Sequence, residues 1–391
     1  MDHQWTPALE QWLREQAIDA GFDTAGIASV DPTPGDVDAQ RFADWIAQGR
    51  AGEMDYLKRR DENGNLLRSA VQVAVPWARS IIVCALNYDA AAPLSIDPAP
   101  PNTGWIARYA WSGHANPANP TDLIPTDYHN QLLTRLRIIE TAIKQRFATE
   151  TPSSNIETRC YVDTGPLVER AAAARAGVGW IGRNTCVINQ QLGSWLLLGV
   201  VITSIPIADG AVFSIAPDRC GSCTRCIDAC PTDALVAPHQ MDASRCIAYL
   251  TIEKKGSIPA DLRAPIGRQV FGCDICQDVC PWNRKSQRKQ SSAQNSLTHK
   301  NDMLPRPQLI NPALDWLATM DSAEFKRWFS GSPIERTRRK RMQRNVAIAM
   351  GNTGDPHFLP QLEAWTTARA TAEDPILAEA AIWAIEQIKN C

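Results

Sequence analysis

Eight of the twelve cysteines in this 391-residue chain lie between residues 220 and 280. Residues 220–231 carry the pattern Cys-x2-Cys-x2-Cys-x3-Cys-Pro, residues 273–281 carry Cys-x2-Cys-x3-Cys-Pro, and Cys246 lies between them. Thiolates at these spacings are typical ligands of iron–sulfur clusters. In a chain without a secretory signal, such crowding indicates metal binding rather than disulfides. The expected chemistry is therefore electron transfer through bound clusters.

The number of thiolates fits two [4Fe–4S] clusters. In the two-cluster ferredoxin pattern, the fourth cysteine of each run ligates the other cluster. This pattern assigns Cys220, Cys223, Cys226 and Cys280 to one cluster, and Cys230, Cys246, Cys273 and Cys276 to the other. The 26 residues between Cys246 and Cys273 exceed the ferredoxin spacing, so we expect this insertion to loop out. Structural zinc also uses Cys-x2-Cys pairs and is the alternative, but the two Cys-Pro endings favour clusters.

Other cofactor motifs are absent or lie in the wrong context. Residues 177–182 match G-x-G-x-x-G, but they follow a predicted helix, whereas a dinucleotide fingerprint follows a strand. The chain has no G-x4-G-K-[ST] phosphate loop and no Cys-x3-Cys-x2-Cys set for radical chemistry. Cys84, Cys160, Cys186 and Cys391 lack ligand spacing, and we expect the first three to be buried free thiols. The cysteine-rich segment therefore carries the main chemical signal.

The rest of the N-terminal half must position the cysteine-rich segment and any substrate or second cofactor. Strands are predicted over 80–88, 159–162 and 193–204, and helices over 1–19, 132–147 and 167–176. Asp163-Thr-Gly-Pro166 forms a predicted turn between a strand and a helix. Residues 89–127 are rich in Pro, Asn and Ala and are interpreted as a long loop. Alternating strands and helices indicate an α/β or α+β core over the first 210 residues.

The length indicates more than one domain. We expect a catalytic domain over 1–215, a ferredoxin-like two-cluster domain over 216–283, a polar connector over 284–306 and an all-α domain over 307–391. Within the last, 345–356 and 378–388 share an Ala-rich apolar pattern, which indicates HEAT-like helical hairpins.

Composition excludes several classes of protein. Hydrophobic residues make up 44% and charged residues 21%, as in globular proteins, and the net charge of −2 gives no uniform basic field. The longest apolar run, residues 195–202, is far shorter than the roughly 20 residues of a membrane span. The N-terminus has no basic region followed by an apolar one, as a signal peptide would. We expect a monomer in the cytoplasm, without a membrane partner.

Several blocks together resemble the epoxyqueuosine reductase family. They are residues 162–188, 193–201, 246–256, 272–283 and 344–352, among them VDTGPLVERAAAARAGVGWIGRNTCVI and GCDICQDVCPWN, and they keep the family's order. The resemblance implies a cobalamin-dependent enzyme with two [4Fe–4S] clusters. Such an enzyme removes the epoxide oxygen of epoxyqueuosine at the wobble position of tRNA and leaves the alkene of queuosine. Its corrinoid and cluster core is similar to that of reductive dehalogenases.

The resemblance also implies site residues. Asp163, in the VDTGP block, matches the family's proton donor; a corrin above it would raise its pKa by desolvation, and a helix-capping role is the alternative. The implied cobalamin contacts are Arg68, Asp163, Asn184, Thr185, Val187, Leu198 and Ala248, with Asn184 to Val187 in the segment 182–187. Arg183 and Ala248 stand where the family commonly has Lys and Ser, so backbone contacts are expected there. No histidine lies in a DxHxxG motif, so we expect no histidine on the cobalt.

A basic run over residues 336–344, RTRRKRMQR, contrasts with the mildly acidic chain. A solvated helix face is the usual explanation, but such a run also suits RNA phosphates. The expected tRNA contacts are Lys254, Lys255, Arg338, Arg339, Lys340 and Arg341. The modified nucleotide would then be flipped into the pocket. The loop over 111–128 is longer than is usual in the family and could reshape the pocket rim.

Two other functions compete with this interpretation. A corrinoid dehalogenase of small organohalides would share the core, but its exported members carry a twin-arginine signal, and it would not need the basic run. A two-cluster electron-transfer protein would leave more than 200 N-terminal residues without a role. The favoured enzyme also requires an external electron donor, such as a flavodoxin or a reductase.

Overall fold

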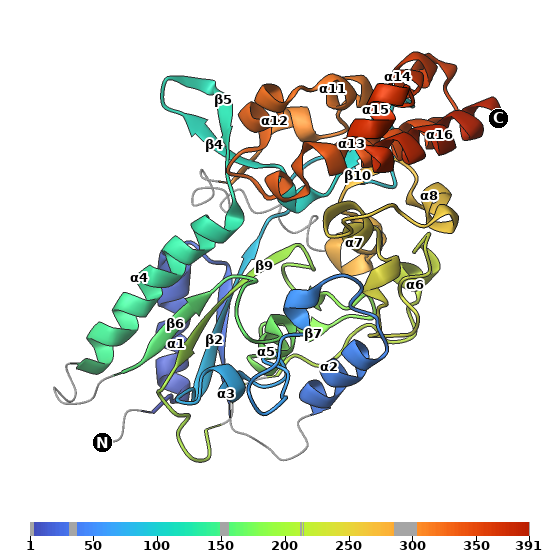
Figure 1. The fold of residues 1–391 in the computed structure, drawn as a ribbon. Coiled ribbons are helices and arrows are strands. Elements are labelled where there is room, and N and C mark those ends of the chain that lie inside the picture. Colours follow the sequence, from blue (N-terminus) through green and yellow to red (C-terminus); the bar gives the residue numbers. More distant parts are fainter. Residues whose placement is uncertain are drawn as a thin grey trace.

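The computed structural model describes residues 4–30, 37–148, 156–211, 213, 215–284 and 303–390. A unit built on a sheet lies at one end of the molecule and a helical unit at the other, with the short helices of the cysteine-rich segment beside them (Figure 1). Most of the predicted connector, residues 285–302, and Cys391 lie outside the described residues.

The central sheet has four strands in the order β1 (Thr24–Ser29), β2 (Ser80–Asn87), β9 (Leu196–Thr203) and β6 (Thr158–Tyr161). Every neighbouring pair is antiparallel. The inner strands β2 and β9 are buried almost throughout, as their continuous apolar sequences require. The strands predicted over 80–88, 159–162 and 193–204 are therefore confirmed, and the antiparallel order makes this unit α+β.

Helices cover both faces of the sheet. Successive residues of a strand point to opposite faces, so Ile82 and Leu86 pack with α1 (Pro7–Asp19) and α4 (Tyr128–Ala148). Ile81 and Val83 pack instead with α3 (Val71–Ala74) and α5 (Glu169–Arg175). Gly26 of β1 is required by this packing, because a Cβ there would lie 1.9 Å from the carbonyl oxygen of Ala176. This contact fixes the C-terminal end of α5 on the sheet, and the helix carries Glu169 in its first turn.

The segment 89–127 is more ordered than its composition predicts. It contains β3 (Trp105–Ile106) and the hairpin of β4 (Ser112–Asn116) and β5 (Asn119–Pro125). β3 pairs in parallel with β10 (Gln269–Phe271), and β4 pairs with β11 (Leu304–Pro305). The prediction of one long loop is therefore wrong. Strands β3 and β4 pair with β10 and β11, which lie more than 150 residues away in the sequence.

The cysteine-rich segment and the C-terminal part consist mainly of helices. The former contains α6 (Arg225–Asp228), α7 (Ile247–Ile252), α8 (Ala260–Ile266) and α9 (Ile275–Asp278). The latter contains α11 (Leu314–Thr319), α12 (Ser322–Phe329), α13 (Arg338–Thr353), α14 (Leu359–Trp365), α15 (Ala368–Glu373) and α16 (Pro375–Lys389). The chain also contains a short antiparallel pair of strands, β7 (Trp180–Ile181) and β8 (Val187–Ile188), and the helix α2 (Val37–Ala47). Across the described ranges, no helix has both the length and the apolar character needed to span a membrane.

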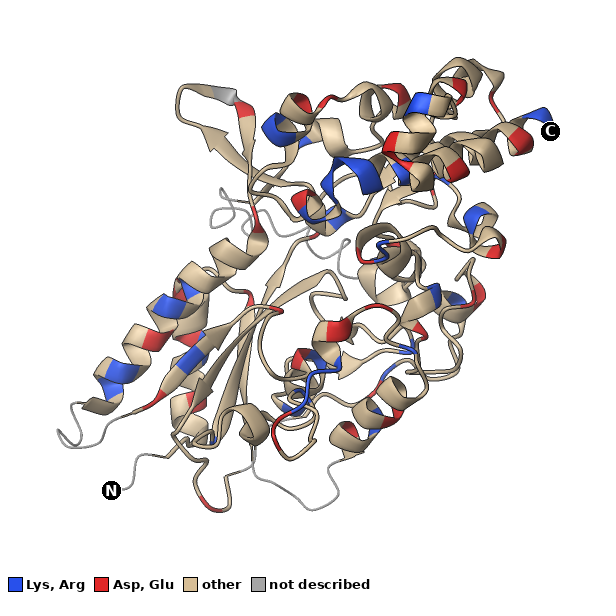
Figure 2. Ribbon diagram, in the orientation of Figure 1, with Lys and Arg blue, Asp and Glu red and all other residues tan. Residues whose placement is uncertain are grey.

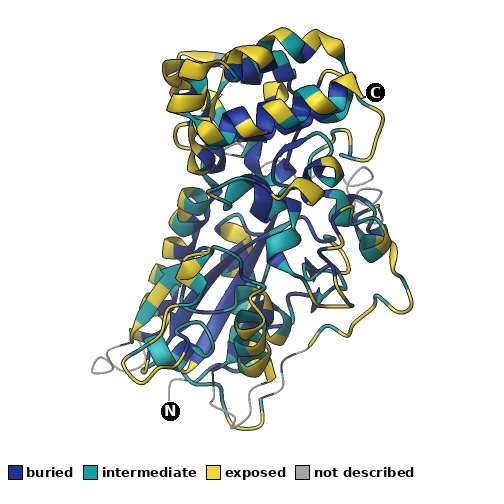
Figure 3. Cartoon of the chain, turned by 45° about the vertical axis from the view of Figure 1, so that its right-hand side comes forward, coloured by how far each residue is buried: buried dark blue, intermediate teal, exposed yellow. Residues whose placement is uncertain are grey.

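One hydrophobic core joins segments that the sequence analysis assigned to three domains. Trp111 from the N-terminal half, Phe271 from the cysteine-rich segment and Met342 from α13 belong to the same buried cluster. The buried interior continues from the helical unit into the middle of the molecule (Figure 3). The buried Asn345 amide donates to the carbonyls of Thr251 (2.8 Å) and Val270 (2.9 Å), tying α13 to α7 and β10. The helical unit is thus fixed against the cluster-binding segment.

Candidate active site and cluster cavities

The first cysteine set surrounds a cavity of about 170 Å³. Cys220, Cys223, Cys226 and Cys280 all line it, together with Trp282 and other residues. The Trp180 indole N–H lies 3.4 Å from Cys220 Sγ, and its ring packs edge-on against Trp282. Burial raises the pKa of Cys226 and Cys280 to about 11. These thiols would therefore release protons when a metal cluster binds.

The second set lies against the catalytic half of the chain. The charge of Cys230 is close enough to raise the pKa of both Cys246 and Cys273, after the larger effect of burial. A hydrogen bond with Cys186, followed by burial, raises the pKa of Cys276. The structure thus brings the predicted second set together and adds Cys186 as an unexpected neighbour. In the part of the chain described, no three His, Cys, Asp or Glu side chains are arranged to hold a single ion.

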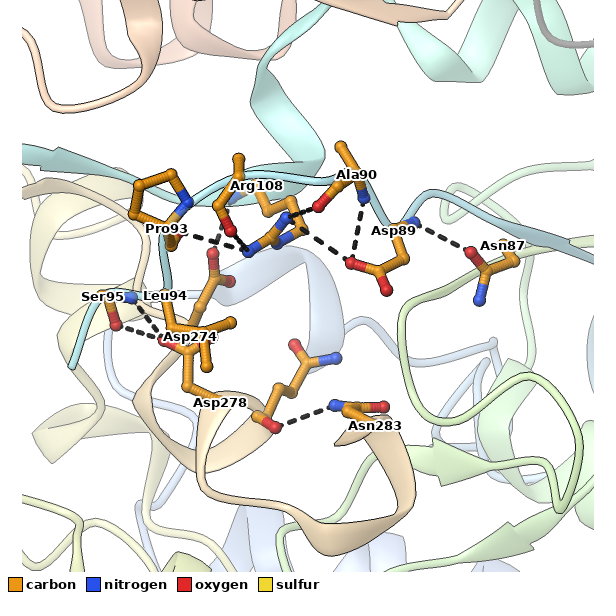
Figure 4. Close-up of polar contacts among 12 residues, drawn as sticks. Asn87, Asp89, Ala90, Pro93, Leu94, Ser95, Arg108, Asp274, Asp278 and Asn283 are labelled. Carbon is orange, nitrogen blue, oxygen red and sulfur yellow. Dashed lines mark hydrogen bonds and ion pairs between the residues drawn. The ribbon is translucent and has the colours of Figure 1, made fainter. Parts of the chain in front are cut away.

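A buried polar network flanks Cys276 (Figure 4). Asp274 accepts a hydrogen bond from the Arg108 backbone N–H (2.6 Å), and Asp278 accepts one from the Ser95 N–H (2.8 Å). The Arg108 guanidinium is also buried and lies 3.5 Å from Asp89. Burial, followed by the charge of Asp278, raises the pKa of Asp274 to about 7. The network fastens the segment from Asp89 to Ser95 onto the cluster-binding helix α9.

Asp163 lies on the turn between β6 and α5, with 45% of its side-chain surface exposed. Its φ of 57° is uncommon for a residue other than glycine, and such strain concentrates at functional sites. Gly165 keeps the turn tight, because a Cβ there would lie 2.5 Å from the Leu167 side chain. The Arg68 guanidinium donates to the Asp163 carbonyl at 3.3 Å. Two of the predicted site residues therefore meet at this turn.

Two residues in the first turn of α4 reach the Asp163 carboxylate, and the preceding Asp127 contacts one of them. The Tyr128 hydroxyl donates to Asp163 Oδ2, and His129 Nε2 lies 3.4 Å from the same oxygen. His129 Nδ1 lies 2.6 Å from Asp127 Oδ1. These residues were not predicted from the sequence, although the run Asp127-Tyr128-His129 lies just before the helix predicted over 132–147. The result is a chain of ionisable groups behind Asp163.

Glu169, in the first turn of α5, forms a carboxyl pair with Asp163. Burial, followed by the charge of Asp163, raises the pKa of Glu169 well above its usual value. Burial acts to raise the pKa of Asp163 as well, but hydrogen bonds from His129 and Tyr128 outweigh it and lower that pKa. The raised pKa expected at Asp163 refers to a corrin bound above it and stays a prediction. Of the two carboxyl groups, Glu169 is therefore the one whose protonated form the surroundings favour.

The pH dependence of stability tests this assignment. An acid with a raised folded-state pKa stabilises the fold below its ordinary pKa of about 4.3, and this contribution is lost as the pH rises towards the folded value. Glu169→Gln keeps the side chain neutral at every pH. We expect its melting temperature to exceed that of the wild type by about 2–4 °C at pH 8 and by much less at pH 5. The exposed Glu62, mutated to Gln, is the matched control; a pH-independent difference would contradict the assignment.

The segment 182–187 lies between the Asp163 turn and the second cysteine set. The Asn184 amide donates to the Cys276 carbonyl at 3.3 Å. Arg170, next to Glu169, donates to the Thr185 carbonyl at 2.7 Å, and Thr185 has a φ of 65°. The other expected cobalamin contacts lie in the buried core beside β9 (Val187 and Leu198) and on α7 (Ala248). Asn184 and Thr185 thus connect the carboxyl pair with the second cluster-binding set.

Basic residues line a cleft of about 990 Å³ beside this site. Its lining contains six basic residues and four acidic ones: Lys255, Arg336, Arg338, Lys340, Arg341 and Arg344, and Asp127, Glu335, Glu373 and Asp374. Figure 2 shows basic residues gathered at the start of α13. Lys340 Nζ donates to the Glu373 carbonyl at 2.9 Å, whereas Arg338 and Lys255 are exposed. The cleft therefore presents positive charge next to the carboxyl pair.

Other basic residues of the run are occupied by the protein itself. Arg341 donates to the carbonyls of Thr337 (2.8 Å) and Ile252 (2.7 Å). Arg344 is fully buried and donates to the carbonyls around Lys254, and Lys254 forms an ion pair with Glu53. Arg339 donates to Gln343 at 2.9 Å. Arg341 and Lys254, both expected to contact RNA, therefore brace the fold in this structure.

Comparisons with known proteins agree on one family. Residues 68–164 match the family model described as epoxyqueuosine reductase QueG, DUF1730, and residues 219–283 match that of a 4Fe-4S double cluster binding domain. The chain is 35% identical over 380 residues to the epoxyqueuosine reductase of Xanthomonas campestris, covering 96% of this chain and 95% of that protein. It is 33% identical to that of Escherichia coli, covering 97% and 89%.

Solved structures of the same family share the fold. A crystal structure of epoxyqueuosine reductase with an epoxyqueuosine-modified stem loop of tRNA-Tyr is similar with a TM-score of 0.78 and 30% identity, over 97% of this chain and 90% of that one. The Bacillus subtilis enzyme, with its catalytic aspartate loop swung out of the active site, is similar with a TM-score of 0.77 and 29% identity, with the same coverage.

Proposed function

Because the chain belongs to the epoxyqueuosine reductase family, we propose that it removes the epoxide oxygen of epoxyqueuosine in tRNA and leaves queuosine. The observation that carries the proposal is the connection between the Asp163–Glu169 carboxyl pair and the second cysteine set through Arg170, Thr185 and Asn184. One site then has both a proton source and an electron route. Replacing the epoxide by an alkene consumes two electrons and two protons and releases water.

The cofactors of the proposal are two [4Fe–4S] clusters and cobalamin. The chain carries a double-cluster domain over residues 219–283, and we assign one cluster to each cysteine set. Cobalamin carries amide arms and few charges, and the groups near Asp163 suit it: the Asn184 amide, the Thr185 backbone and apolar side chains such as Leu198. Arg183 turns away, donating to the Gly221 carbonyl. When bound, cobalamin supplies the reducing power that opens the epoxide.

The chain's own residues manage the protons. We assign Asp163 as the group that delivers a proton to the departing oxygen, since its carboxylate is exposed and lies on a strained turn. Burial and the charge of Asp163 raise the pKa of Glu169, so Glu169 is the member of the pair suited to hold a proton and pass it to Asp163. Tyr128 and His129 orient the Asp163 carboxylate through its Oδ2. The pair can therefore supply a proton without drawing it from bulk water.

The basic cleft is the proposed binding site of the tRNA. Arg338, Lys340 and Lys255 lie on it, where positive charge suits a phosphate backbone. The modified nucleotide would leave its stack to reach Asp163. We also propose that α13 and α16, where a Cβ on Gly351 would lie 2.7 Å from Ala384 Cα, form a HEAT-like pair that carries this cleft.

Because the proposed substrate is tRNA, we propose that the enzyme works in the cytoplasm. We further propose that it works as a monomer, with a separate electron donor reducing the clusters. The small-organohalide alternative leaves the basic cleft without a role, and the family relatives do not favour it.

Mass spectrometry of the reaction product tests the function. Anaerobic protein carrying both clusters and cobalamin is mixed with a strong reductant and an epoxyqueuosine-modified stem loop, and the digested nucleosides are weighed. We expect the substrate nucleoside to lose one oxygen atom. A parallel reaction with a small aryl halide is expected to leave the halide intact. If the fully loaded protein dehalogenates the halide but leaves the epoxide, the proposal is wrong.

A further inference from the structure

Arg336 connects the basic cleft to the proton-carrying groups. It lies in the short 3-10 turn Pro333–Thr337, is exposed and lines the 990 Å³ cleft. Its Nη2 lies 2.7 Å from His129 Nε2 and 3.0 Å from His129 Nδ1. No carboxylate pairs with this guanidinium among the residues that the structure describes. The Arg336 side chain therefore contacts both the proposed RNA-binding cleft and the group of residues around Asp163.

The two nitrogens of His129 have different partners. Nδ1 lies 2.6 Å from the Asp127 carboxylate, which can only accept, so Nδ1 carries a hydrogen. Nε2 also lies 3.4 Å from Asp163 Oδ2, which accepts when ionised. The Arg336 nitrogen is nearly equidistant from both ring nitrogens, so the guanidinium lies against the imidazole ring and not along the Nε2 lone pair. Its positive charge there opposes protonation of the ring, whereas a protonated ring donates to Asp163.

We propose that Arg336 is a coupling residue: a phosphate of the bound RNA draws its guanidinium off His129, and the freed Nε2 then takes a proton and pairs with Asp163. This inference rests on the proposed function, because it takes RNA as the occupant of the cleft. Arg336 is a positioning residue in this scheme and touches neither the epoxide nor a cofactor. Proton supply would thereby be tied to engagement of the RNA backbone.

The charges around His129 support the direction of the effect. Burial lowers the pKa of His129 and is the largest influence, but hydrogen bonds to Asp127 and Asp163 outweigh it, so the pKa is raised overall. The charge of Arg336 opposes this rise. Tyr128 packs against the ring, with centroids 4.0 Å apart, and bears no charge. Moving Arg336 away therefore raises the pKa of His129 further.

The test follows the His129 ring by NMR in protein labelled at its six histidines. The resonance is assigned with His129→Gln, and an unmodified anticodon stem loop serves as an unreactive probe whose binding is checked by fluorescence anisotropy. In the wild type, we expect the bound stem loop to raise the pKa of His129 by on the order of one unit. In Arg336→Ala, the pKa should already be raised in the free protein and should move little on binding.

Two variants complete the design. Arg336→Lys keeps the charge and should retain part of the RNA-dependent shift, whereas Arg369→Ala, on the exposed face of α15, should behave like the wild type. A stem loop that binds without moving the pKa of His129, or that moves it equally in Arg336→Ala, would overturn the coupling. Failure of the proposed function is separate, because it would appear as retention of the epoxide oxygen by the loaded enzyme.

Discussion

Asp163→Asn is expected to slow removal of the epoxide oxygen by about 10²–10⁴-fold, the usual contribution of a positioned general acid. Asparagine has the same shape but carries no transferable carboxyl proton. It also tolerates a left-handed backbone, so the φ of 57° does not strain the variant. The measurement is single-turnover oxygen loss from the modified stem loop, with both clusters and cobalamin loaded.

The control for this variant is Asp209→Asn, at an exposed aspartate remote from the site. Asp209→Asn should match the wild type in rate and in melting temperature, and both variants should match the wild type in iron content. Wild-type turnover by Asp163→Asn, at any pH between 6 and 8, would remove Asp163 from the proton path. The Glu169–Tyr128–His129 group would then have to act without it.

Cys276→Ala is expected to lose the iron of one cluster and to reduce turnover below detection. Cys276 belongs to the set with Cys246 and Cys273, and its carbonyl accepts from Asn184 beside the candidate cobalamin site. Loss of this ligand breaks the electron route at its inner end, where no other described cysteine set is available. The measurements are iron content and the electron paramagnetic resonance signal of the reduced protein.

Cys160→Ala is the matched control, since Cys160 is a half-buried free thiol on β6 beside Glu140. It should keep the full iron content and the full signal. A Cys276→Ala protein that retained both clusters would show that another group ligates the second cluster. Cys186, which contacts Cys276, would be the first residue to examine.

Features encoded by local spacing could be predicted from the sequence. The cysteine sets, the buried strands β2 and β9 and the helix α4 each depend on a short pattern of residue types. Asp163 could be placed on its turn for the same reason. Glu169 was missed because its protonation depends on burial and on the Asp163 charge, and neither is visible in a linear motif.

Features that depend on long-range packing could not be predicted. The segment 89–127 was interpreted as a loop because β3 and β4 acquire their partners from β10 and β11. The basic run was treated as one surface, yet Arg344 is buried among backbone carbonyls. The packing of α13 against α7 determines which basic residues brace the fold, and two of these, Arg341 and Arg344, also line the cleft.

The buried Arg108 network bears on how this enzyme can be re-engineered. Asp274 and Asp278 flank Cys276, a proposed cluster ligand, yet they hold Arg108 and Ser95 from the N-terminal half (Figure 4). If residues 216–283 of this chain were grafted into another redox protein, they would arrive without these partners. The buried carboxylates of Asp274 and Asp278 would lose their donors, and helix α9 would lose its support. A functional graft of the electron-transfer segment therefore has to include residues 89–108 as well, because the two segments share one buried polar network.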